Sequence, residues 1–73
     1  MKTSAPHEQL VINELEELEL NLEKLSFFMD GSTFQQLPIV DQSLLIAQLG
    51  IMEAYINILE TRVALFTSST LAN

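Results

Sequence analysis

The sequence predicts an all-α fold: an antiparallel two-helix hairpin that assembles into a homo-oligomeric helical bundle. Three observations lead to this prediction: two apolar stripes with a sevenfold repeat, a short polar connection between them, and apolar residues left over beside the stripes. The 73 residues leave room for one small domain, residues 1–73. Below roughly 70 to 80 residues a single core seldom supplies more than about 5 kcal/mol of stability, so a lone hairpin would be marginal.

The first helix is predicted over about residues 7–29, where one apolar stripe runs along the chain. Its members recur at alternating steps of four and three residues: Val11, Leu15, Leu18, Leu22, Leu25 and Met29. Because an α-helix turns once in about 3.6 residues, these steps place the side chains on one helix face.

A second helix is predicted over about residues 38–66. Its stripe follows the same steps at Leu45, Leu49, Met52, Ile56, Leu59, Val63 and Phe66. Pro38 suits the first turn of this helix, where a missing N–H costs nothing. Residues 67–73 are rich in serine and threonine, so we expect a frayed tail there.

The turn between the helices is predicted over residues 30–37. Gly31 is expected to take the left-handed conformation that ends the first helix, and the small polar residues after it suit a tight connection. Phe34 and Leu37 are apolar inside this polar bend, so we expect them to plug the tip of the hairpin.

Apolar residues outside the two stripes predict self-association. The second helix carries a further row and the first carries three more such residues: Leu44, Ile51, Tyr55, Ile58 and Leu65, then Leu20, Phe27 and Phe28. One partner helix covers one seam only, and a long exposed apolar row is a liability in a monomer. The economical interpretation is that hairpins associate through this row.

Charge and composition argue against several partners. Ten Asp and Glu residues stand against three Lys and Arg, a formal net charge of −7, which disfavours contact with DNA, RNA or anionic lipid. Gln48 and Glu53 interrupt the apolar stretches well short of the roughly 20 residues that span a bilayer. Residues 1–6 lack the apolar segment of a secretory signal. We therefore expect a soluble, cytoplasmic protein with no membrane partner.

Residues for catalysis or metal binding are scarce. The chain has no cysteine and one histidine, His7, so neither a thiolate metal site nor a nucleophile–histidine pair is available. The Glu-x-x-His pairs of two-metal helical bundles are missing. The two glycines, Gly31 and Gly50, form no phosphate-binding loop. The sequence thus predicts a non-enzyme with no cofactor and no metal.

Several motifs together resemble a known family. They include Pro-His-Glu-Gln at residues 6–9, Glu-Lys-Leu-Ser-Phe-Phe-Met at 23–29, and Gln-Leu-x-x-Met-x-x-Tyr-x-x-Ile-Leu-x-x-Arg-Val at 48–63. In this combination the chain resembles the small phage helical-hairpin family that includes the anti-CBASS and anti-Thoeris cyclic-nucleotide sponge proteins. The resemblance implies an oligomer, typically a hexamer, that binds cyclic di- or trinucleotide immune signals in the cytoplasm of an infected bacterial host. Such sequestration works by mass action and needs no turnover.

The resemblance also implies phosphate contacts near the turn, where family members place a threonine and a lysine. Here the turn offers the hydroxyls of Ser32 and Thr33 and the backbone of Gly31. The remaining candidate ligand residues are the basic side chains Lys24, Arg62 and His7. In a symmetric oligomer several copies of Arg62 could converge on repeated phosphates.

Each candidate also has a plain structural interpretation. Ser32 and Thr33 are common turn residues, and Lys24 is an ordinary solubilising residue. Arg62 has no acid three or four residues away on its own helix, so its structural partner would be a carboxylate of another helix or chain. Tyr55 either packs in an interface or offers a stacking surface for a base.

A second hypothesis is an acidic structural or protein-interaction hairpin, which would act as an oligomerising adaptor or as an inhibitor of a host protein without a nucleotide ligand. Acidic residues cluster on the first helix at Glu8, Glu14, Glu16, Glu17, Glu19 and Glu23. A negative surface attracts a phosphate-rich ligand poorly at long range. Thermal stabilisation by a particular cyclic nucleotide would separate the two hypotheses.

Overall fold

The computed structural model confirms the all-α fold. It describes residues 6–72, with side chains described for residues 6–67. Three helices follow one another: α1 (Pro6–Met29), α2 (Ser32–Gln35) and α3 (Ile39–Ala72). Between residues 6 and 72 there is no β-strand.

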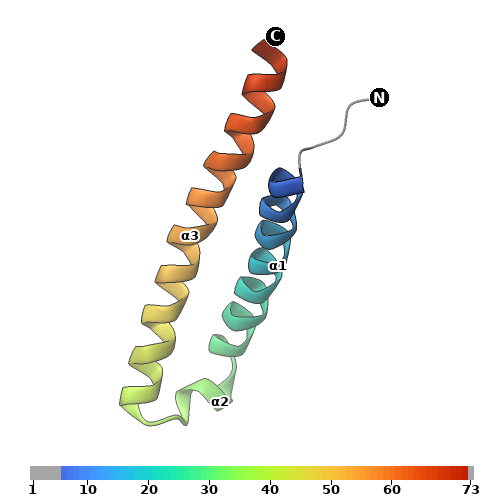
Figure 1. Ribbon diagram of the computed structural model, residues 1–73. Helices are drawn as coiled ribbons and strands as arrows, with labels where there is room; N and C mark the ends of the chain where they lie inside the picture. Colours follow the sequence, from blue (N-terminus) through green and yellow to red (C-terminus); the bar gives the residue numbers. More distant parts are fainter. Residues whose placement is uncertain (1–5, 73) are drawn as a thin grey trace.

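The two long helices, α1 and α3, lie side by side and run in opposite directions (Figure 1). The molecule is a rod of 53 × 18 × 16 Å. One end, the tip, consists of residues 30–38 and includes α2. At the other end, here named the open end, α3 extends past the start of α1 (Figure 1). The connection is short enough that neighbouring helices must be antiparallel.

The contact between α1 and α3 is built from the two predicted apolar stripes. Val11 of α1 and Ile56 and Leu59 of α3 are buried, Leu59 completely at 0% exposure. The other members of both stripes are half-buried. The seven residues of α3 that face α1 are termed its inner stripe: Leu45, Leu49, Met52, Ile56, Leu59, Val63 and Phe66. One apolar seam is therefore covered within the chain.

Gly31 does not adopt the left-handed conformation that the sequence suggests. Its φ of −89° and ψ of 167° are extended, and none of the described glycines has a positive φ. The reason is that α2 begins at the next residue, and the position before a helix takes extended backbone. The end of α1 is closed instead by the N–H of Gly31, which donates to the carbonyl of Phe28 at 3.1 Å.

Apolar residues plug the tip, as predicted. Phe34 of α2 is buried, and its ring meets that of Phe28 edge to face with centroids 6.3 Å apart. Leu37 is half-buried beside it. Such an aromatic pair is worth about 0.5–1.5 kcal/mol beyond its burial.

Gln42 ties the connection to the first turn of α3. Its side-chain amide donates to the carbonyls of Leu37 at 2.9 Å and Gln35 at 3.2 Å. The helix α3 begins at Ile39, directly after Pro38. The carbonyl of Pro38 accepts the hydrogen bond of the first helical turn, from the backbone N–H of Gln42 at 3.0 Å. Each bond adds roughly 1 kcal/mol to the stability of the tip.

The end of the second helix was predicted too early, at residue 66. The helix α3 continues through Ala72, and Asn73, the last residue of the predicted tail, lies outside the described residues. The hydroxyl of Thr67 donates to the carbonyl of Val63 at 3.2 Å, and Thr61 makes the same kind of bond to Asn57 at 2.9 Å. Because such bonds satisfy the hydroxyl inside the helix, a run of serine and threonine need not end it.

By length and composition alone, Ile39–Thr67 of α3 could cross a membrane. Gln48 and Glu53 therefore interrupt the apolar stretch less than the sequence suggests. A single helix of this kind is weak evidence for a membrane protein, because the core helix of a soluble protein has the same length and composition. A helix that packs on two of its faces has this composition too.

Candidate ligand-binding surface

Four predicted ligand residues lie at or near the tip. Gly31 is half-buried, and Ser32 and Thr33 are exposed. Lys24 is exposed on α1, five residues or about 7.5 Å before the helix ends at Met29. These four residues are termed the tip group.

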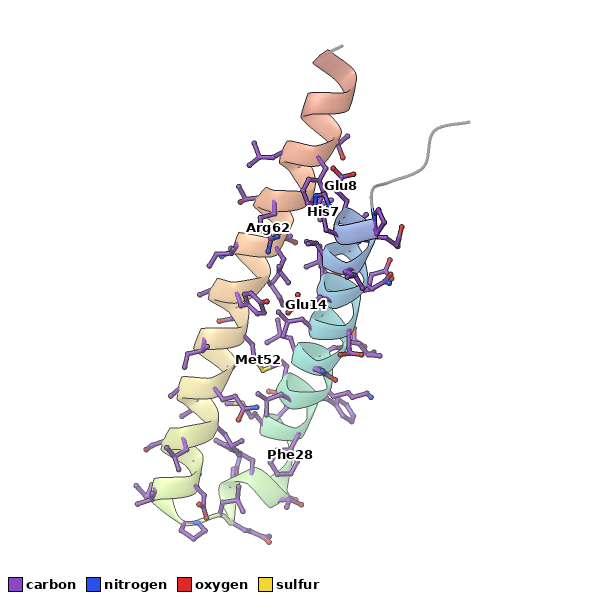
Figure 2. The ribbon with its side chains drawn as sticks, in the orientation of Figure 1. His7, Glu8, Glu14, Phe28, Met52 and Arg62 are labelled. Atoms are coloured by element: carbon purple, nitrogen blue, oxygen red, sulfur yellow. The ribbon has the colours of Figure 1, made fainter. Side chains whose placement is uncertain are left out.

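The other two predicted ligand residues lie near the open end. His7 is in the first turn of α1, and its ring meets that of Phe66 edge to face with centroids 6.1 Å apart. Arg62 of α3 is exposed, and Figure 2 shows it at the same end of the rod as His7 and Glu8. His7 and Arg62 are termed the open-end group.

The two groups are too far apart to hold one ligand within one chain. His7 and Lys24, the members of the two groups on α1, are separated by 17 residues, about 26 Å at a rise of about 1.5 Å per residue. A cyclic dinucleotide is far shorter than this distance. A site that combines both groups therefore needs more than one copy of the chain.

Two basic side chains, Lys24 and Arg62, are exposed on the described surface. Neither Lys24 nor Arg62 makes a hydrogen bond or an ion pair with another described residue. Arg62 does act electrostatically on Tyr55, which lies seven residues earlier on α3. Both positive charges are therefore available to an anion.

Tyr55 and Glu14 form a polar contact midway along the rod. The hydroxyl of Tyr55 donates a hydrogen bond to a carboxylate oxygen of Glu14 on α1. This bond, followed by desolvation and the negative charge of Glu14, raises the pKa of Tyr55, while the positive charge of Arg62 lowers it. The contact fixes the position of α1 relative to α3 along the axis of the rod, because it places Glu14 directly opposite Tyr55. This position along the axis is termed the level of a residue.

Four further acids lie on the solvated surface of α1. Glu16, Glu17, Glu19 and Glu23 are all exposed. Among the described residues no three His, Cys, Asp or Glu side chains come together in a way that could hold a metal ion. The described surface thus offers hydrogen bonding and charge, from hydroxyls, carboxylates, two cations and the tyrosine ring, together with exposed apolar side chains.

Comparison with models of known protein families identifies one family to which this chain is related. The model of the Sequestin family matches residues 5–65, which is most of the chain. The chain belongs to the Sequestin family. The match agrees with the resemblance to the phage sponge proteins, and the name Sequestin implies a sequestering role rather than a catalytic one. No curated protein and no solved structure matches the chain.

The segment shared with the Sequestin family contains both groups of candidate residues. It covers α1, α2 and α3 up to residue 65. The match therefore spans the tip group and the open-end group together, although the two lie at opposite ends of the rod.

The contact between Glu14 and Tyr55 is a feature of this surface that the sequence did not lead us to expect. The sequence suggested a solvated acid at position 14 and a packing or stacking residue at 55. A usable signal was present: each residue directly precedes a stripe position, Leu15 and Ile56. In antiparallel helices, residues that flank the seam on the same side meet across it.

Proposed function

We propose that this protein is a phage anti-defence protein that binds cyclic di- or trinucleotide immune signals and sequesters them, without turnover, in the cytoplasm of an infected bacterial host. The observation that carries the proposal is the Sequestin match over residues 5–65. Two cations without a hydrogen-bond or ion-pair partner among the described residues, Lys24 and Arg62, support the choice of a phosphate-bearing ligand. So do the exposed hydroxyls of Ser32 and Thr33 in the turn. Charge-assisted hydrogen bonds of this kind are the strong ones in phosphate recognition.

We further propose that the ligand is held between copies of the chain in a homo-oligomer, with a hexamer as the first assembly to test. The distance between the tip group and the open-end group supports this. A sponge must bind with submicromolar affinity, a binding free energy of about −8 kcal/mol or stronger. Scattered exposed side chains of one rod are a poor source of such affinity, because solvent screens them. A pocket shared between copies excludes that solvent.

Isothermal titration against cyclic di- and trinucleotides and cyclic ADP-ribose isomers tests the proposal. We expect submicromolar binding of at least one compound, with a stoichiometry below one ligand per chain. Heating the complex should release the ligand intact, since no turnover is involved. Silence across the panel, from protein shown to be folded and assembled, would overturn the sponge proposal.

Charge removal tests the assigned residues. Lys24→Ala, Arg62→Ala and Thr33→Ala should each weaken binding, about tenfold or more for the two cations, because a hydrogen bond to a charged group contributes about 1.5–3 kcal/mol. Asn57→Asp is the charge-matched control, since it also lowers the net charge by one, at an exposed residue that is not a candidate ligand. Unchanged affinity in an assembled Arg62→Ala variant would remove Arg62 from the site.

A second candidate function is an acidic module that docks on a host protein. The exposed carboxylates of α1, Glu16, Glu17, Glu19 and Glu23, favour it, because such a surface suits a basic protein partner. This function predicts no thermal stabilisation by any cyclic nucleotide. It also predicts a host protein that copurifies with the native chain and is lost when the four carboxylates are changed to amides.

A further inference from the structure

We propose that α3 pairs with α3 of a second copy, antiparallel, about a twofold axis near Tyr55. The surface involved is termed the outer row: Leu44, Gln48, Ile51, Tyr55, Ile58, Arg62 and Leu65. This inference specifies the assembly in the proposed function and is independent of the nucleotide. It rests on the spacing, exposure and order of the residues in the row.

The outer row has the spacing of a helix seam. Its members follow one another at steps of four and three residues, each one position before a member of the inner stripe. A sevenfold repeat of this kind matches the surface of another helix. The inner stripe is covered by α1, but Leu44, Ile51, Ile58 and Leu65 are 63%, 70%, 56% and 62% exposed. The outer row is therefore a second seam, about 32 Å long, with no partner helix among the described residues 6–72.

The order of residues in the row identifies the partner. From either end it reads leucine, polar residue, isoleucine, tyrosine, isoleucine, polar residue, leucine. A twofold contact is self-complementary, so that when one position meets another the reverse contact forms as well. About an axis near Tyr55, Leu44 of one copy comes close to Leu65 of the second, and Ile51 comes close to Ile58. A row that is the same in both directions fits a second copy of itself.

Arg62 decides the direction of the pairing. In a parallel contact each Arg62 would lie beside Arg62 of the second copy, and juxtaposed like charges are costly in an interface. In the antiparallel contact Arg62 instead approaches Gln48 of the second copy, whose amide oxygen accepts a hydrogen bond. Arg62 makes no hydrogen bond or ion pair within the described residues of its own chain. A polar residue in a helix seam is a known means of fixing orientation.

The same pairing brings together the two cations that lie apart in one chain. Glu14 and Tyr55 are hydrogen-bonded and so lie at one level. Lys24, ten residues further along α1, is then level with residue 45 of the antiparallel α3. The axis near Tyr55 exchanges residue 45 with residue 65, so Arg62 of the second copy lies about 4.5 Å along the rod from the level of Lys24. Each pair of copies would thus present two mixed Lys24 and Arg62 sites for phosphate groups.

Distances between spin labels test the geometry directly. The chain has no native cysteine, so Ser43→Cys, Ala54→Cys and Thr67→Cys, all at exposed positions, can each carry one label in protein diluted with unlabelled chain. In the antiparallel pair the distance between labels grows by about 3 Å for each residue away from Tyr55. We expect a short distance at position 54 and a component at about 36 Å at both 43 and 67. Equally short distances at all three positions would mean a parallel pair and would overturn the proposal.

Charge substitutions test the same contact without labels. Ile51→Lys and Ile58→Glu should each raise the dissociation constant of the pair at least tenfold, measured by light scattering. The double variant should recover most of the association, because each introduced lysine then faces the introduced glutamate of the second copy. Ala64→Glu, at an exposed position outside both the row and the inner stripe and away from the axis, is the control and should assemble normally. A double variant no better than the worse single variant would contradict an antiparallel contact.

A lipid surface is the competing occupant of the outer row, and native protein with phosphatidylcholine vesicles tests it. We expect the assembled chain to stay in solution. Native protein that is monomeric and sediments with vesicles would overturn the proposal. The two proposals can fail separately. Protein that shows the expected label distances but binds no nucleotide would support this interface and overturn only the sponge proposal.

Discussion

The inner stripe and the outer row of α3 have the same spacing and similar residues, yet they differ completely in burial. Leu59 of the inner stripe is 0% exposed, while its neighbour Ile58 in the outer row is 56% exposed. One residue, a rotation of about 100° around the helix axis, separates the two environments. A sevenfold repeat therefore predicts that a face will meet another helix, but not whether that helix belongs to the same chain.

The two faces also differ in where their polar residues lie. The inner stripe is apolar throughout, whereas the outer row contains Gln48 and Arg62. An apolar seam contributes stability without choosing a direction, because most alignments bury similar area. Polar residues in a seam cost stability but select one alignment. The inner contact needs no polar residues, because the short turn already fixes how α1 and α3 align. The outer contact has no such turn, so Gln48 and Arg62 have to select its partner and direction.

The largest expected effect is that of Leu59→Ala in the inner stripe. Removing a fully buried leucine side chain should lower the free energy of unfolding by about 3 kcal/mol, from lost burial and the cavity left behind. Urea unfolding followed by circular dichroism measures it, at fixed protein concentration because assembly itself stabilises the fold.

Ile58→Ala is the matched comparison, one residue away in the outer row. In dilute, dissociated protein it should change the free energy of unfolding by no more than about 0.5 kcal/mol, as for other surface substitutions. In concentrated protein it should weaken assembly. Equal losses for Leu59→Ala and Ile58→Ala in dissociated protein would show that the two faces are not distinct within the chain.

Phe34→Leu tests whether the inner contact depends on its plug at the tip. The substitution keeps an apolar side chain but removes the edge-to-face contact with Phe28. We expect a loss of about 1 kcal/mol in the free energy of unfolding. Phe27→Leu, at a position 82% exposed, is the control and should have little effect on the dissociated chain. A loss for Phe27→Leu as large as that for Phe34→Leu would argue against a specific plug.

Much of this fold could be predicted from the sequence because its pattern is local. Steps of four and three residues predicted the covered seam from Val11 through Phe66, and the apolar residues of the polar bend predicted the plug at Phe34. The backbone of Gly31 and the end of α3 could not be predicted in this way. Whether Gly31 is left-handed depends on the following residues forming α2, and whether α3 continues past Phe66 depends on hydroxyls bonding to the preceding turn.

The candidate site was harder to predict because it depends on levels along the two helices. The sequence named the hydroxyls and cations, but not that the nearest α1 residues of the tip group and the open-end group, Lys24 and His7, lie about 26 Å apart. The bond between Tyr55 and Glu14 joins residues 41 positions apart in the chain, and it is this bond that sets the level of each cation. Long-range polar contacts of this kind follow from packing, which single-sequence patterns do not specify.

Tyr55→Phe tests the hydrogen bond between Tyr55 of the outer row and Glu14 of α1. We expect a smaller effect on the free energy of unfolding than for the substitutions above. The raised pKa of Tyr55 means that the fold favours the protonated hydroxyl. Its contribution to stability is therefore fully present below the ordinary pKa of 10.0 and is lost as pH rises through the higher pKa of the folded state. Tyr55→Phe should lower the free energy of unfolding slightly at neutral pH. It should also abolish the decrease in stability above the pKa of Tyr55.

Phenolate absorbance measures the titration cleanly, because Tyr55 is the only tyrosine. Glu14→Gln should move the pKa of Tyr55 back towards 10.0, since it weakens the hydrogen bond to Glu14, the largest cause of the shift, and removes the negative charge beside the hydroxyl. A pKa unchanged by Glu14→Gln would mean that the bond across the seam does not form in solution, and the levels assigned to Lys24 and Arg62 would lose their support.

The smallest expected effect is that of Gly31→Ala, which lies beyond the end of both faces. An alanine tolerates the extended backbone at this position, and its Cβ would lie 3.4 Å from the carbonyl oxygen of Phe28, an ordinary contact. The free energy of unfolding should change by less than about 1 kcal/mol, with any gain coming from the lower entropy of the unfolded chain. Gly50→Ala, where nothing lies within 4 Å of the new Cβ, should stabilise α3 by up to about 1 kcal/mol through helix propensity. A loss well above 1 kcal/mol at position 31 alone would mean that the turn needs a left-handed glycine after all. The seam that α1 covers would then depend on a special backbone conformation, instead of following from the pattern of its side chains.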